Sequence, residues 1–337
     1  MKILSLFDGI SCARVALERV GFSVETYYAS EVDKYATQIS QKNYPDIFRV
    51  PYGSGDVTKL KFKDSFPYTD IDLLIGGSPC QDLSIAKKDR KGLNGERSGL
   101  FWEYVRILNE VKPKYFILEN VNSMPKEAKQ LITETLGVEP IMINASLVSA
   151  QNRKRLFWTN IPNVCLPEDK GILLKDILEG DNDNVRACSL RGRYTIEGRR
   201  IDIKGAKTQQ RLELGGDKAN AITSVQKDSL VFIGGIGKKD WVGDGKYFSR
   251  NYPQGQRVYS PEGKTPTLSA NGGGLGAKTG LYEVDGDIRK LTPIECERLQ
   301  GLPDNYTEGI SNTQRYKCCG NAFNVDVVAH ILSFIPR

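Results

Sequence analysis

The stretch Lys2-Ile3-Leu4-Ser5-Leu6-Phe7-Asp8-Gly9-Ile10-Ser11-Cys12 joins an apolar run to a glycine-bearing turn. A short apolar run of this kind, followed by helical spacing over residues 13–20, predicts a buried strand, a tight loop and a helix. Backbone N–H groups at the start of such a helix can hold an anionic or polar group. An ordinary strand–helix turn explains the same residues, so the loop alone does not establish a ligand site.

The same alternation of apolar runs and helical spacing continues through residue 165. We predict strands at 2–7, 26–29, 72–75, 115–118, 141–145 and 156–159, and helices at 13–20, 34–43, 99–110 and 127–136. This order is typical of the α/β class with a Rossmann-like, mostly parallel sheet and helices on both faces. Ligands of such sheets bind at the carboxyl ends of the strands. The residues that follow each strand are therefore the candidates for function.

The middle of the chain has a different composition, rich in Gly, Asp, Asn, Lys and Arg over residues 170–288, with short β-like runs. Helical spacing returns after residue 289 and ends with a helix over 323–334. We predict a catalytic domain of residues 1–168 and 313–337 and a smaller β-rich domain of residues 169–312. Eight Lys and Arg stand against two acids over residues 186–211. This excess suits phosphate neutralisation by a nucleic-acid-binding surface, although a solvated basic surface is the alternative.

Composition excludes several classes of protein. The 337 residues contain seven cysteines at irregular spacing and one histidine, His330. This pattern argues against a disulfide framework, a structural zinc site and most histidine-dependent hydrolases. The sequence contains no run of 18 or more apolar residues. The early acidic residue Asp8 and the lack of a small-residue cleavage site lead us to expect no secretory leader. We therefore expect an intracellular, cytoplasmic protein that needs no metal.

Two carboxylates stand where a nucleoside would be bound. Glu31 follows the strand at 26–29, about 20 residues beyond the glycine loop, and can accept hydrogen bonds from ribose hydroxyls. Asp56, in Gly55-Asp56-Val57, can accept a hydrogen bond from an adenine amino group. Exposed acids are the alternative for both residues. The single glycine of the first loop does not match the dinucleotide fingerprint, so a different nucleoside-containing cofactor is indicated.

A cysteine follows the strand at 72–75, in Gly76-Gly77-Ser78-Pro79-Cys80-Gln81. The glycines permit a tight turn, and Pro79 stiffens the approach to Cys80. A cysteine near a helix start favours the thiolate over the thiol. We predict that Cys80 is a nucleophile, with a buried structural cysteine as the alternative.

Charged residues also border the strands at 115–118 and 156–159. Glu119, in Glu119-Asn120-Val121, is expected to be partly buried and able to share a proton. Arg153 and Arg155, in Gln151-Asn152-Arg153-Lys154-Arg155, are two residues apart and would share one face of an extended chain. We expect both guanidinium groups to point toward the ligand, with solvated basic residues as the alternative.

These motifs, in this order, resemble the C5 cytosine-specific DNA methyltransferase family over nearly all of residues 1–165 and about 288–326. The matching segments are Pro79-Cys80-Gln81, Glu119-Asn120-Val121, Gln151-x-Arg153-x-Arg155, residues 289–303 and Gly320-Asn321-Ala322. Each is short, but their joint order is very specific. The opening Asp8-Gly9-Ile10 departs from the commoner bacterial Phe-x-Gly-x-Gly loop. The catalytic half looks closest to the animal de novo methyltransferases.

The resemblance implies methyl transfer from S-adenosylmethionine to C5 of a flipped-out cytosine in a specific duplex DNA sequence, through a covalent Cys80 adduct. It implies the catalytic residues Cys80, Glu119, Arg153 and Arg155. It implies the cofactor contacts Phe7, Asp8, Gly9, Glu31, Val32, Asp56, Val57, Pro79, Leu100, Asn321 and Ala322. It implies DNA contacts from Gln81, Ser84, Lys87, Arg90, Arg191 and Arg193.

The implied partner is double-stranded DNA, recognised by the basic middle segment. A cognate restriction endonuclease acting separately, a monomeric state and nucleoid association in a bacterial or phage setting are further expectations. An RNA cytosine-5 methyltransferase is the first alternative, and it is disfavoured because the Cys-Phe-Thr tripeptide of the tRNA-methylating branch is absent. A catalytically inactive DNA-binding homologue is the second, and it is disfavoured because the nucleophile and its partners are all present.

Overall fold

The computed structural model describes residues 1–61, 70–79, 99–179 and 291–337, together with the backbone of short strands between residues 188 and 289. The predicted nucleophile Cys80 lies outside the described residues. Five of the six predicted DNA contacts lie outside them as well: Gln81, Ser84, Lys87, Arg90 and Arg193.

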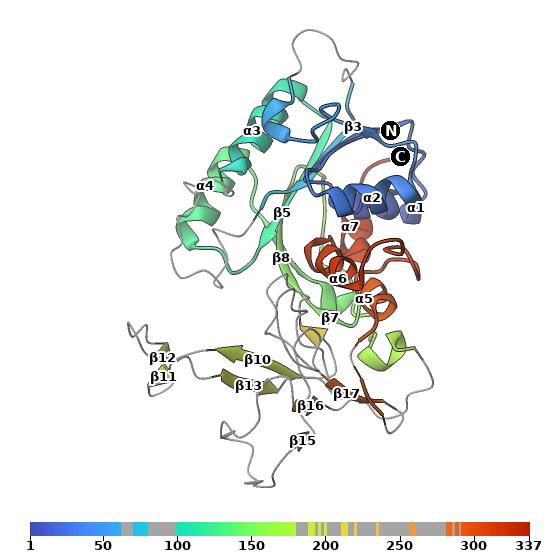
Figure 1. Ribbon diagram of the computed structural model, residues 1–337. Helices are drawn as coiled ribbons and strands as arrows, with labels where there is room; N and C mark the ends of the chain where they lie inside the picture. Colours follow the sequence, from blue (N-terminus) through green and yellow to red (C-terminus); the bar gives the residue numbers. More distant parts are fainter. Residues whose placement is uncertain are drawn as a thin grey trace.

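A seven-stranded sheet forms the centre of the molecule, in the order β3-β2-β1-β4-β5-β8-β6 (Figure 1). Its strands are β1 (Lys2–Leu6), β2 (Thr26–Ser30), β3 (Phe48–Arg49), β4 (Leu73–Gly77), β5 (Tyr115–Val121), β6 (Ile141–Asn144) and β8 (Lys154–Thr159). All pairs are parallel except those of β8, which runs antiparallel to β5 and β6. The predicted mostly parallel sheet is confirmed, and the two-residue strand β3 was not predicted.

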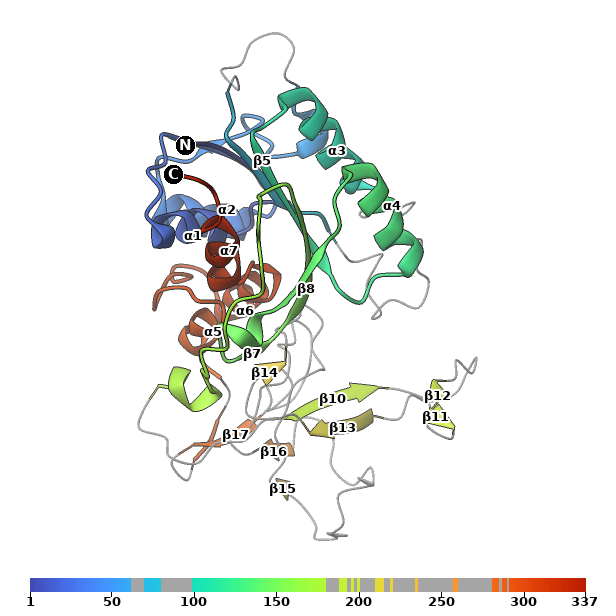
Figure 2. The ribbon, with the colours of Figure 1, turned by 180° about the vertical axis from the view of Figure 1, so that it is seen from behind.

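Helices cover both faces of the sheet, as predicted. Those in the described residues are α1 (Cys12–Val20), α2 (Lys34–Asn43), α3 (Leu100–Val111), α4 (Lys126–Leu136), α5 (Pro293–Leu299), α6 (Asn312–Asn321) and α7 (Val325–Leu332). Helices α1, α2 and α7 lie on one face, and α3 and α4 lie on the other (Figures 1 and 2). No helix in the described part of the chain has the length and apolar character that crossing a membrane requires.

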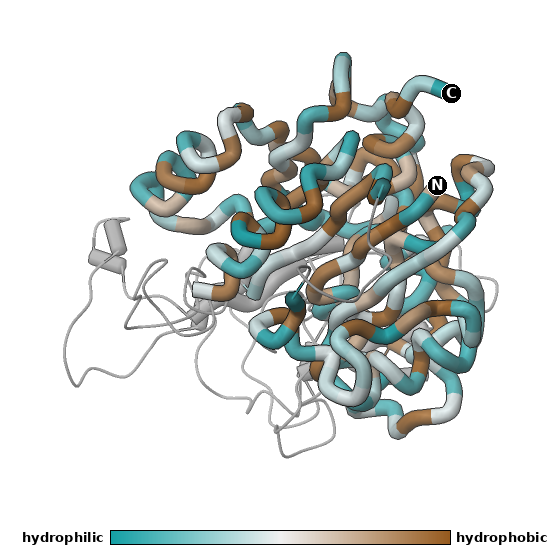
Figure 3. Tube along the Cα trace, turned by 90° about the horizontal axis from the view of Figure 1, so that it is seen from above, coloured by the Kyte–Doolittle hydropathy of each residue, from teal (hydrophilic) through white to brown (hydrophobic). Residues whose placement is uncertain are grey.

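Two clusters of buried side chains hold these layers together. Along β4, Leu73 and Ile75 belong to the cluster under α1 and α7, whereas Leu74 belongs to the cluster under α3 and α4. Side chains of a strand alternate between its two faces, so a strand covered on both sides must be apolar throughout. Figure 3 shows the complementary pattern in the helices, where hydrophobic and hydrophilic segments alternate. This arrangement explains why continuous apolar runs marked the strands.

The C-terminal segment packs on the first helix of the chain. The Tyr306 hydroxyl donates a hydrogen bond to the Ile10 carbonyl (2.7 Å), and the Arg19 guanidinium donates to the Gly301 carbonyl (2.6 Å). Leu302 and Tyr306 belong to the core cluster of α1 and α7. The predicted domain division between residues 312 and 313 stays a prediction. The contacts of Gly301, Leu302 and Tyr306 hold this part of the chain against α1.

The described backbone between residues 188 and 289 consists of short strands. They are β10 (Cys188–Gly192), β11 (Thr195–Ile196), β12 (Arg199–Arg200), β13 (Gln210–Leu214), β14 (Ala219–Asn220), β15 (Gly234–Gly235), β16 (Arg257–Tyr259), β17 (Leu281–Val284) and β18 (Asp287–Arg289). Arg191, a predicted DNA contact, lies in β10 opposite Arg211 of β13. One parallel pair joins this region to the sheet domain, between β14 and β7 (Gln151–Asn152).

Candidate active site

The loop between β1 and α1 is a tight turn that buried side-chain hydrogen bonds stabilise. Phe7, Gly9 and Ser11 all have positive φ, at 55°, 59° and 61°. Asp8 is buried, and its carboxylate accepts hydrogen bonds from the hydroxyls of Tyr27 (2.8 Å) and Ser11 (2.5 Å). The Asp8 side chain therefore stabilises the loop from the protein interior, and its role as a cofactor contact stays a prediction.

Glu31 lies directly against this loop. One of its carboxylate oxygens accepts the Gly9 N–H (2.8 Å), and the other accepts the N–H groups of Val32 (2.9 Å) and Asp33 (2.8 Å). Burial raises the pKa of Glu31, and the backbone hydrogen bonds only partly oppose that effect. The Ser11 side chain does not cap α1, because its hydroxyl donates to the Asp8 carboxylate. A carboxylate and a helix start thus lie on either side of Gly9.

Asp56 is brought beside Glu31 by a close approach of the backbone. Gly55 has a φ of +61°, and a Cβ atom at this position would lie 2.0 Å from the Glu31 carbonyl oxygen. The Ser30 hydroxyl holds the Gly55 carbonyl at 2.7 Å. Asp56 begins a 3-10 turn, Val57–Lys59, where the Thr58 side chain and N–H lower its pKa. The structure therefore brings the residue before Asp56 against the backbone of Glu31.

Hydrophobic cofactor candidates border the same region. Phe7 and Leu100 are partly buried and pack against the core under α3 and α4. Val57 is buried, whereas Val32 is 70% exposed. A nucleoside bound at Glu31 would find apolar surface at the ends of β1, β2 and α3.

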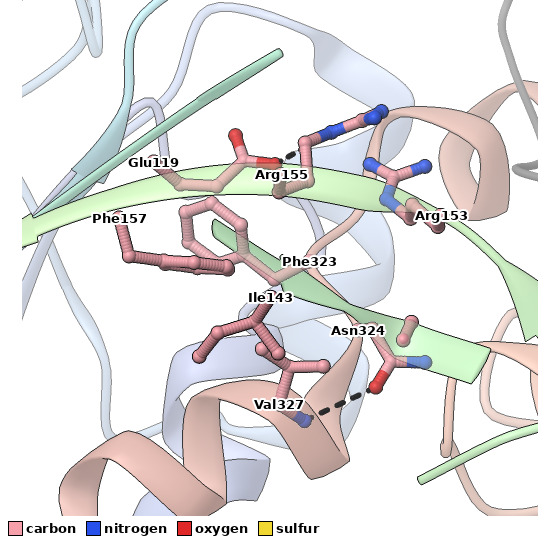
Figure 4. Close-up of a pocket in the computed structure, with 9 residues that line it drawn as sticks. Glu119, Ile143, Arg153, Arg155, Phe157, Phe323, Asn324 and Val327 are labelled. Atoms are coloured by element: carbon pink, nitrogen blue, oxygen red, sulfur yellow. Dashed lines mark hydrogen bonds and ion pairs between the residues drawn. The ribbon is translucent and has the colours of Figure 1, made fainter. Parts of the chain in front are cut away.

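Glu119 and Arg155 form an ion pair at the end of β5. The distance between Arg155 Nε and Glu119 Oε1 is 2.8 Å, and the two side chains are only 15% and 13% exposed. Glu119 faces Phe157 across the β5–β8 pair, and Arg155 faces Val121. Glu119 and Arg155 are thus diagonal neighbours on one face of two antiparallel strands, within reach of each other. Figure 4 shows the resulting pair.

The turn toward Cys80 begins next to Glu119. Gly77 is paired with Glu119 in the sheet, and the buried Ser78 follows it. The Asn120 amide donates hydrogen bonds to the Ser78 hydroxyl (3.0 Å) and carbonyl (3.4 Å). Cys80 lies three residues beyond Gly77, so the Cα atoms of these two residues are at most about 11 Å apart. The half-buried Pro79 leads directly to it.

Arg153 has different partners from those expected. Its guanidinium donates to the carbonyls of Gly320 (3.1 Å) and Ala322 (2.9 Å), and its side chain is buried. The ion pair of Glu119 is formed with Arg155, and the implied catalytic role of Arg153 stays a prediction. Helix α6 ends against the β7–β8 junction, where its carbonyls meet Arg153.

A pocket lies under the ion pair and contains residues that the sequence did not single out as functional. It is lined by Glu119, Arg153, Arg155, Ile143, Ala145, Phe157, Phe323, Asn324 and Val327. Figure 4 shows the rings of Phe157 and Phe323 gathered below Glu119. A Cβ atom on Gly77 would lie 2.8 Å from the Phe323 ring. The position of Phe323 directly after Gly320-Asn321-Ala322 was the available signal for its role.

Comparison with known proteins identifies the family. The sequence profile of the C-5 cytosine-specific DNA methylases matches residues 1–337. The chain belongs to this family. It is a DNA (cytosine-5)-methyltransferase, and the predicted fold and reaction class are confirmed.

Similar proteins agree with this assignment. The type II methyltransferase M.HhaI of Haemophilus parahaemolyticus is 31% identical, over 98% of this chain and 93% of its own length. The orphan methyltransferase M.Rho11sI of Bacillus phage rho11s is 31% identical, over 93% of this chain and 66% of its own length. The crystal structure of the S. pombe Dnmt2 methyltransferase shares the fold, with a TM-score of 0.58 at 16% identity, over 99% of this chain and 97% of that one.

Proposed function

We propose that the enzyme methylates C5 of a cytosine flipped out of duplex DNA, with Cys80 as nucleophile and with Glu119 and Arg155 holding the base. The observation that carries this proposal is the partly buried Glu119–Arg155 ion pair beside Gly77, three residues before Cys80. A carboxylate and a guanidinium at this distance match the N3/N4 edge and the O2 carbonyl of cytosine. Unstacking and unpairing the base costs a few kcal/mol, and the contacts that the base makes in such a pocket offset this cost.

The reaction follows from the chemistry of these groups. The Cys80 thiolate adds to C6, and the electron pair of the C5–C6 bond becomes available at C5. Glu119 binds the N3/N4 edge and stabilises the ring as charge develops there. S-adenosylmethionine, the methyl donor that enzymes of this family use, would supply an electrophilic methyl group to C5; its S–CH3 bond would break, and S-adenosylhomocysteine would leave. Loss of the C5 proton to a base then breaks the C6–S bond and releases the Cys80 thiolate.

The structure describes the side chains of five other cysteines, and four of these are unsuited to act as the nucleophile. Cys12, Cys296, Cys318 and Cys319 are buried, and burial raises the pKa of each thiol, to about 12 for Cys318. Such thiols stay protonated at neutral pH and cannot attack a base. Cys165 is exposed, and its carbonyl is bound to His330. We choose Cys80 because it lies three positions after Gly77 in the sequence, and Gly77 is paired with Glu119 in the sheet.

The cofactor would bind across the ends of β1 and β2. Glu31 retains acceptor capacity for ribose hydroxyls, since one of its oxygens accepts a single hydrogen bond. The uncapped start of α1 suits the carboxylate of the methionine part. We assign the adenine to the region of Phe7, Asp56 and Val57, with Val32, Pro79 and Leu100 around it. Asn321 and Ala322 at the end of α6 complete the proposed site.

DNA would approach the same edge of the sheet. Gln81, Ser84, Lys87, Arg90, Arg191 and Arg193 stay predicted DNA contacts. Phosphate contacts by such residues would set affinity and register, while a few side chains would read base edges in the major groove. A separately acting restriction endonuclease and a monomeric state also stay predictions.

A labelling experiment tests the proposal. The enzyme is incubated with S-adenosylmethionine carrying a labelled methyl group and mixed-sequence duplex DNA, beside an RNA control. We expect label at cytosine C5 in DNA only, its loss in Cys80→Ala, and its retention in Cys165→Ala. Absence of transfer by folded wild-type protein that binds the cofactor would refute the proposal. Label in RNA would instead favour an RNA cytosine methyltransferase.

A further inference from the structure

Arg153 lies at the junction of β7 and β8, where the chain turns into the strand that carries Arg155. Its two terminal guanidinium nitrogens donate to the carbonyls of Gly320 and Ala322, at 3.1 Å and 2.9 Å. These two carbonyls stand on either side of Asn321 in the sequence. Arg153 therefore binds the backbone of the segment that the proposed cofactor site uses.

The end of α6 has a physical need for such a partner. The last carbonyls of a helix have no N–H partner within the helix, and they carry the negative end of its dipole. Gly320 lies in the last turn of α6, and Ala322 follows its last residue. A guanidinium bound to both carbonyls satisfies them and neutralises the dipole in a buried setting, where Arg153 is only 4% exposed.

Other hydrogen bonds hold the same segment from α5. The Gln300 side-chain amide donates to the Cys319 carbonyl (2.6 Å), and the Val325 N–H donates to the Gln300 carbonyl (2.9 Å). The Asn324 amide donates to the Leu299 carbonyl (3.1 Å). Residues 319–325 are thus fixed between α5 on one side and Arg153 on the other.

This fixed segment serves both halves of the active site. Asn321 is exposed and is a proposed cofactor contact, whereas Phe323 lines the pocket under Glu119 and touches the surface of Gly77. A shift of the segment by a fraction of an ångström would move both side chains together. Its position is therefore a requirement for binding the cofactor and for shaping the base pocket.

We propose that Arg153 is a positioning residue that holds residues 320–323, and so places Asn321 at the cofactor and Phe323 at the base pocket, without touching the base. The inference rests on the proposed function, because it takes Asn321 as a cofactor contact. Arg155 has the other role. Its Nε is paired with Glu119, and its side chain is less buried than that of Arg153.

The same substitution at both arginines separates the two roles. Arg153→Lys keeps the charge but can reach only one carbonyl, and Arg155→Lys loses the planar donor group. Titration calorimetry with S-adenosylhomocysteine, without DNA, measures cofactor binding alone. We expect Kd to rise about tenfold in Arg153→Lys and to change less than about twofold in Arg155→Lys. The kcat at saturating cofactor and DNA should fall further in Arg155→Lys.

A double-mutant cycle with Asn321→Ala excludes a merely structural effect. If Arg153 acts through Asn321, the double variant should bind S-adenosylhomocysteine about as weakly as the weaker single variant. Gln300→Met removes the tether from α5 and should raise Kd in the same direction, which provides a second test if Arg153→Lys does not fold. Circular dichroism at the assay temperature verifies the fold of each variant.

Two results would overturn the inference. One is an unchanged Kd in Arg153→Lys and Gln300→Met together with a reduced kcat in Arg153→Lys, which would make Arg153 a base contact. The other is fully additive effects of Arg153→Lys and Asn321→Ala. Wild-type protein that neither binds S-adenosylhomocysteine nor methylates DNA would refute the proposed function instead, so the two failures are distinguishable.

Discussion

The two sides of the active site are held in place differently. At the ends of β1 and β2, backbone groups position the candidate cofactor residues. At the ends of β4, β5 and β8, side chains position one another through an ion pair and hydrogen bonds. The Glu31 carboxylate accepts hydrogen bonds from three backbone N–H groups, and the backbone of Gly55 approaches the Glu31 carbonyl too closely to leave room for a Cβ atom. On the other side, Glu119 is paired with Arg155, and Asn120 with Ser78. Backbone contacts fix a shape that tolerates little change in the path of the chain. Side-chain pairs position charged groups, and the interaction is lost when a single functional group is replaced.

The largest effect is expected on the side of the paired side chains. Glu119→Gln keeps the size of the side chain but removes the carboxyl group that can share a proton with the N3/N4 edge, so the charge that develops on the ring is less stabilised. We expect kcat to fall by about 10²- to 10⁴-fold, with the Kd of S-adenosylhomocysteine almost unchanged. Methyl transfer in single-turnover experiments and calorimetry measure the two quantities.

Glu103→Gln is the matched control for that experiment. Glu103 is paired with Arg106 on α3 at 2.7 Å, so this variant loses the same charge from an ion pair outside the site. Its kcat should stay close to that of the wild type. Equal losses in Glu103→Gln and Glu119→Gln would contradict a special role for the Glu119–Arg155 pair.

On the cofactor side, Glu31→Gln should weaken binding and also change how stability depends on pH. Loss of a charged acceptor should raise the Kd of S-adenosylhomocysteine by about tenfold or more. Burial raises the pKa of Glu31 above its ordinary 4.5. A carboxyl group whose pKa is raised by folding stabilises the folded state most below pH 4.5, and this contribution is lost as the pH rises through the raised value.

Denaturant unfolding without cofactor, from pH 4 upward, measures that dependence. The wild type should lose stability relative to Glu31→Gln as the pH rises through this window. Glu25→Gln is the control, since Glu25 is exposed and makes only a 3.9 Å contact with Lys2. Parallel curves for the wild type and Glu31→Gln would show that folding does not raise the pKa of this group.

A smaller loss of affinity is expected when the backbone approach at Glu31 is disturbed. A Cβ atom in Gly55→Ala would lie 2.0 Å from the Glu31 carbonyl oxygen, at a φ of +61°, so the loop must move. We expect the Kd of S-adenosylhomocysteine to rise about fivefold and the free energy of unfolding to fall by about 2 kcal/mol or more. Gly53→Ala has a comparable φ of +78° but meets nothing within 4 Å. It should cost only about 1 kcal/mol of stability and leave Kd unchanged. Similar changes of Kd and stability in both variants would show that the positive φ, and not the approach to Glu31, causes the effect of Gly55→Ala.

The sheet and the reaction class could be predicted because both leave local signals. Leu73-Leu74-Ile75 is apolar on both faces, and Glu119 directly follows such a run. Helix α5 also left a signal that was not used, since Thr292 and Glu295 form a capping box with Pro293 at the first position. Helix α6, whose sequence is NTQRYKCCGN, has little apolar periodicity and depends on its packing.

The partners of Arg153 could not be predicted in the same way. They lie 167 and 169 residues further along the chain, and they are carbonyl groups, which every residue has. A sequence motif identifies the guanidinium but not the backbone that it binds. The motif therefore indicated a charged group at this edge of the sheet but not the main-chain carbonyls that it binds.

The smallest effect is expected where the two sides of the active site meet. Lys317, four residues before Asn321 on α6, pairs with Asp33 at 2.6 Å, and Asp33 lies two residues after Glu31. The two side chains are 44% and 26% exposed, so solvent screens the pair and Lys317→Met should cost about 0.5 kcal/mol of stability at most. The other carboxylate oxygen of Asp33 still accepts the N–H groups of Tyr35 and Ala36, so the start of α2 should remain intact.

The Lys317–Asp33 pair joins α6 to the loop between β2 and α2 that contains Glu31. We therefore expect the Kd of S-adenosylhomocysteine to rise about twofold in Lys317→Met at low salt and to approach the wild-type value near 1 M salt. Lys42→Met, which breaks the 3.4 Å pair with Glu308 on the surface, should change stability as little and cofactor binding not at all. If both variants bind the cofactor like the wild type, the backbone contacts at Glu31 suffice to position the cofactor residues without the ion pair from α6. That result would strengthen the contrast between backbone positioning at Glu31 and side-chain positioning at Glu119.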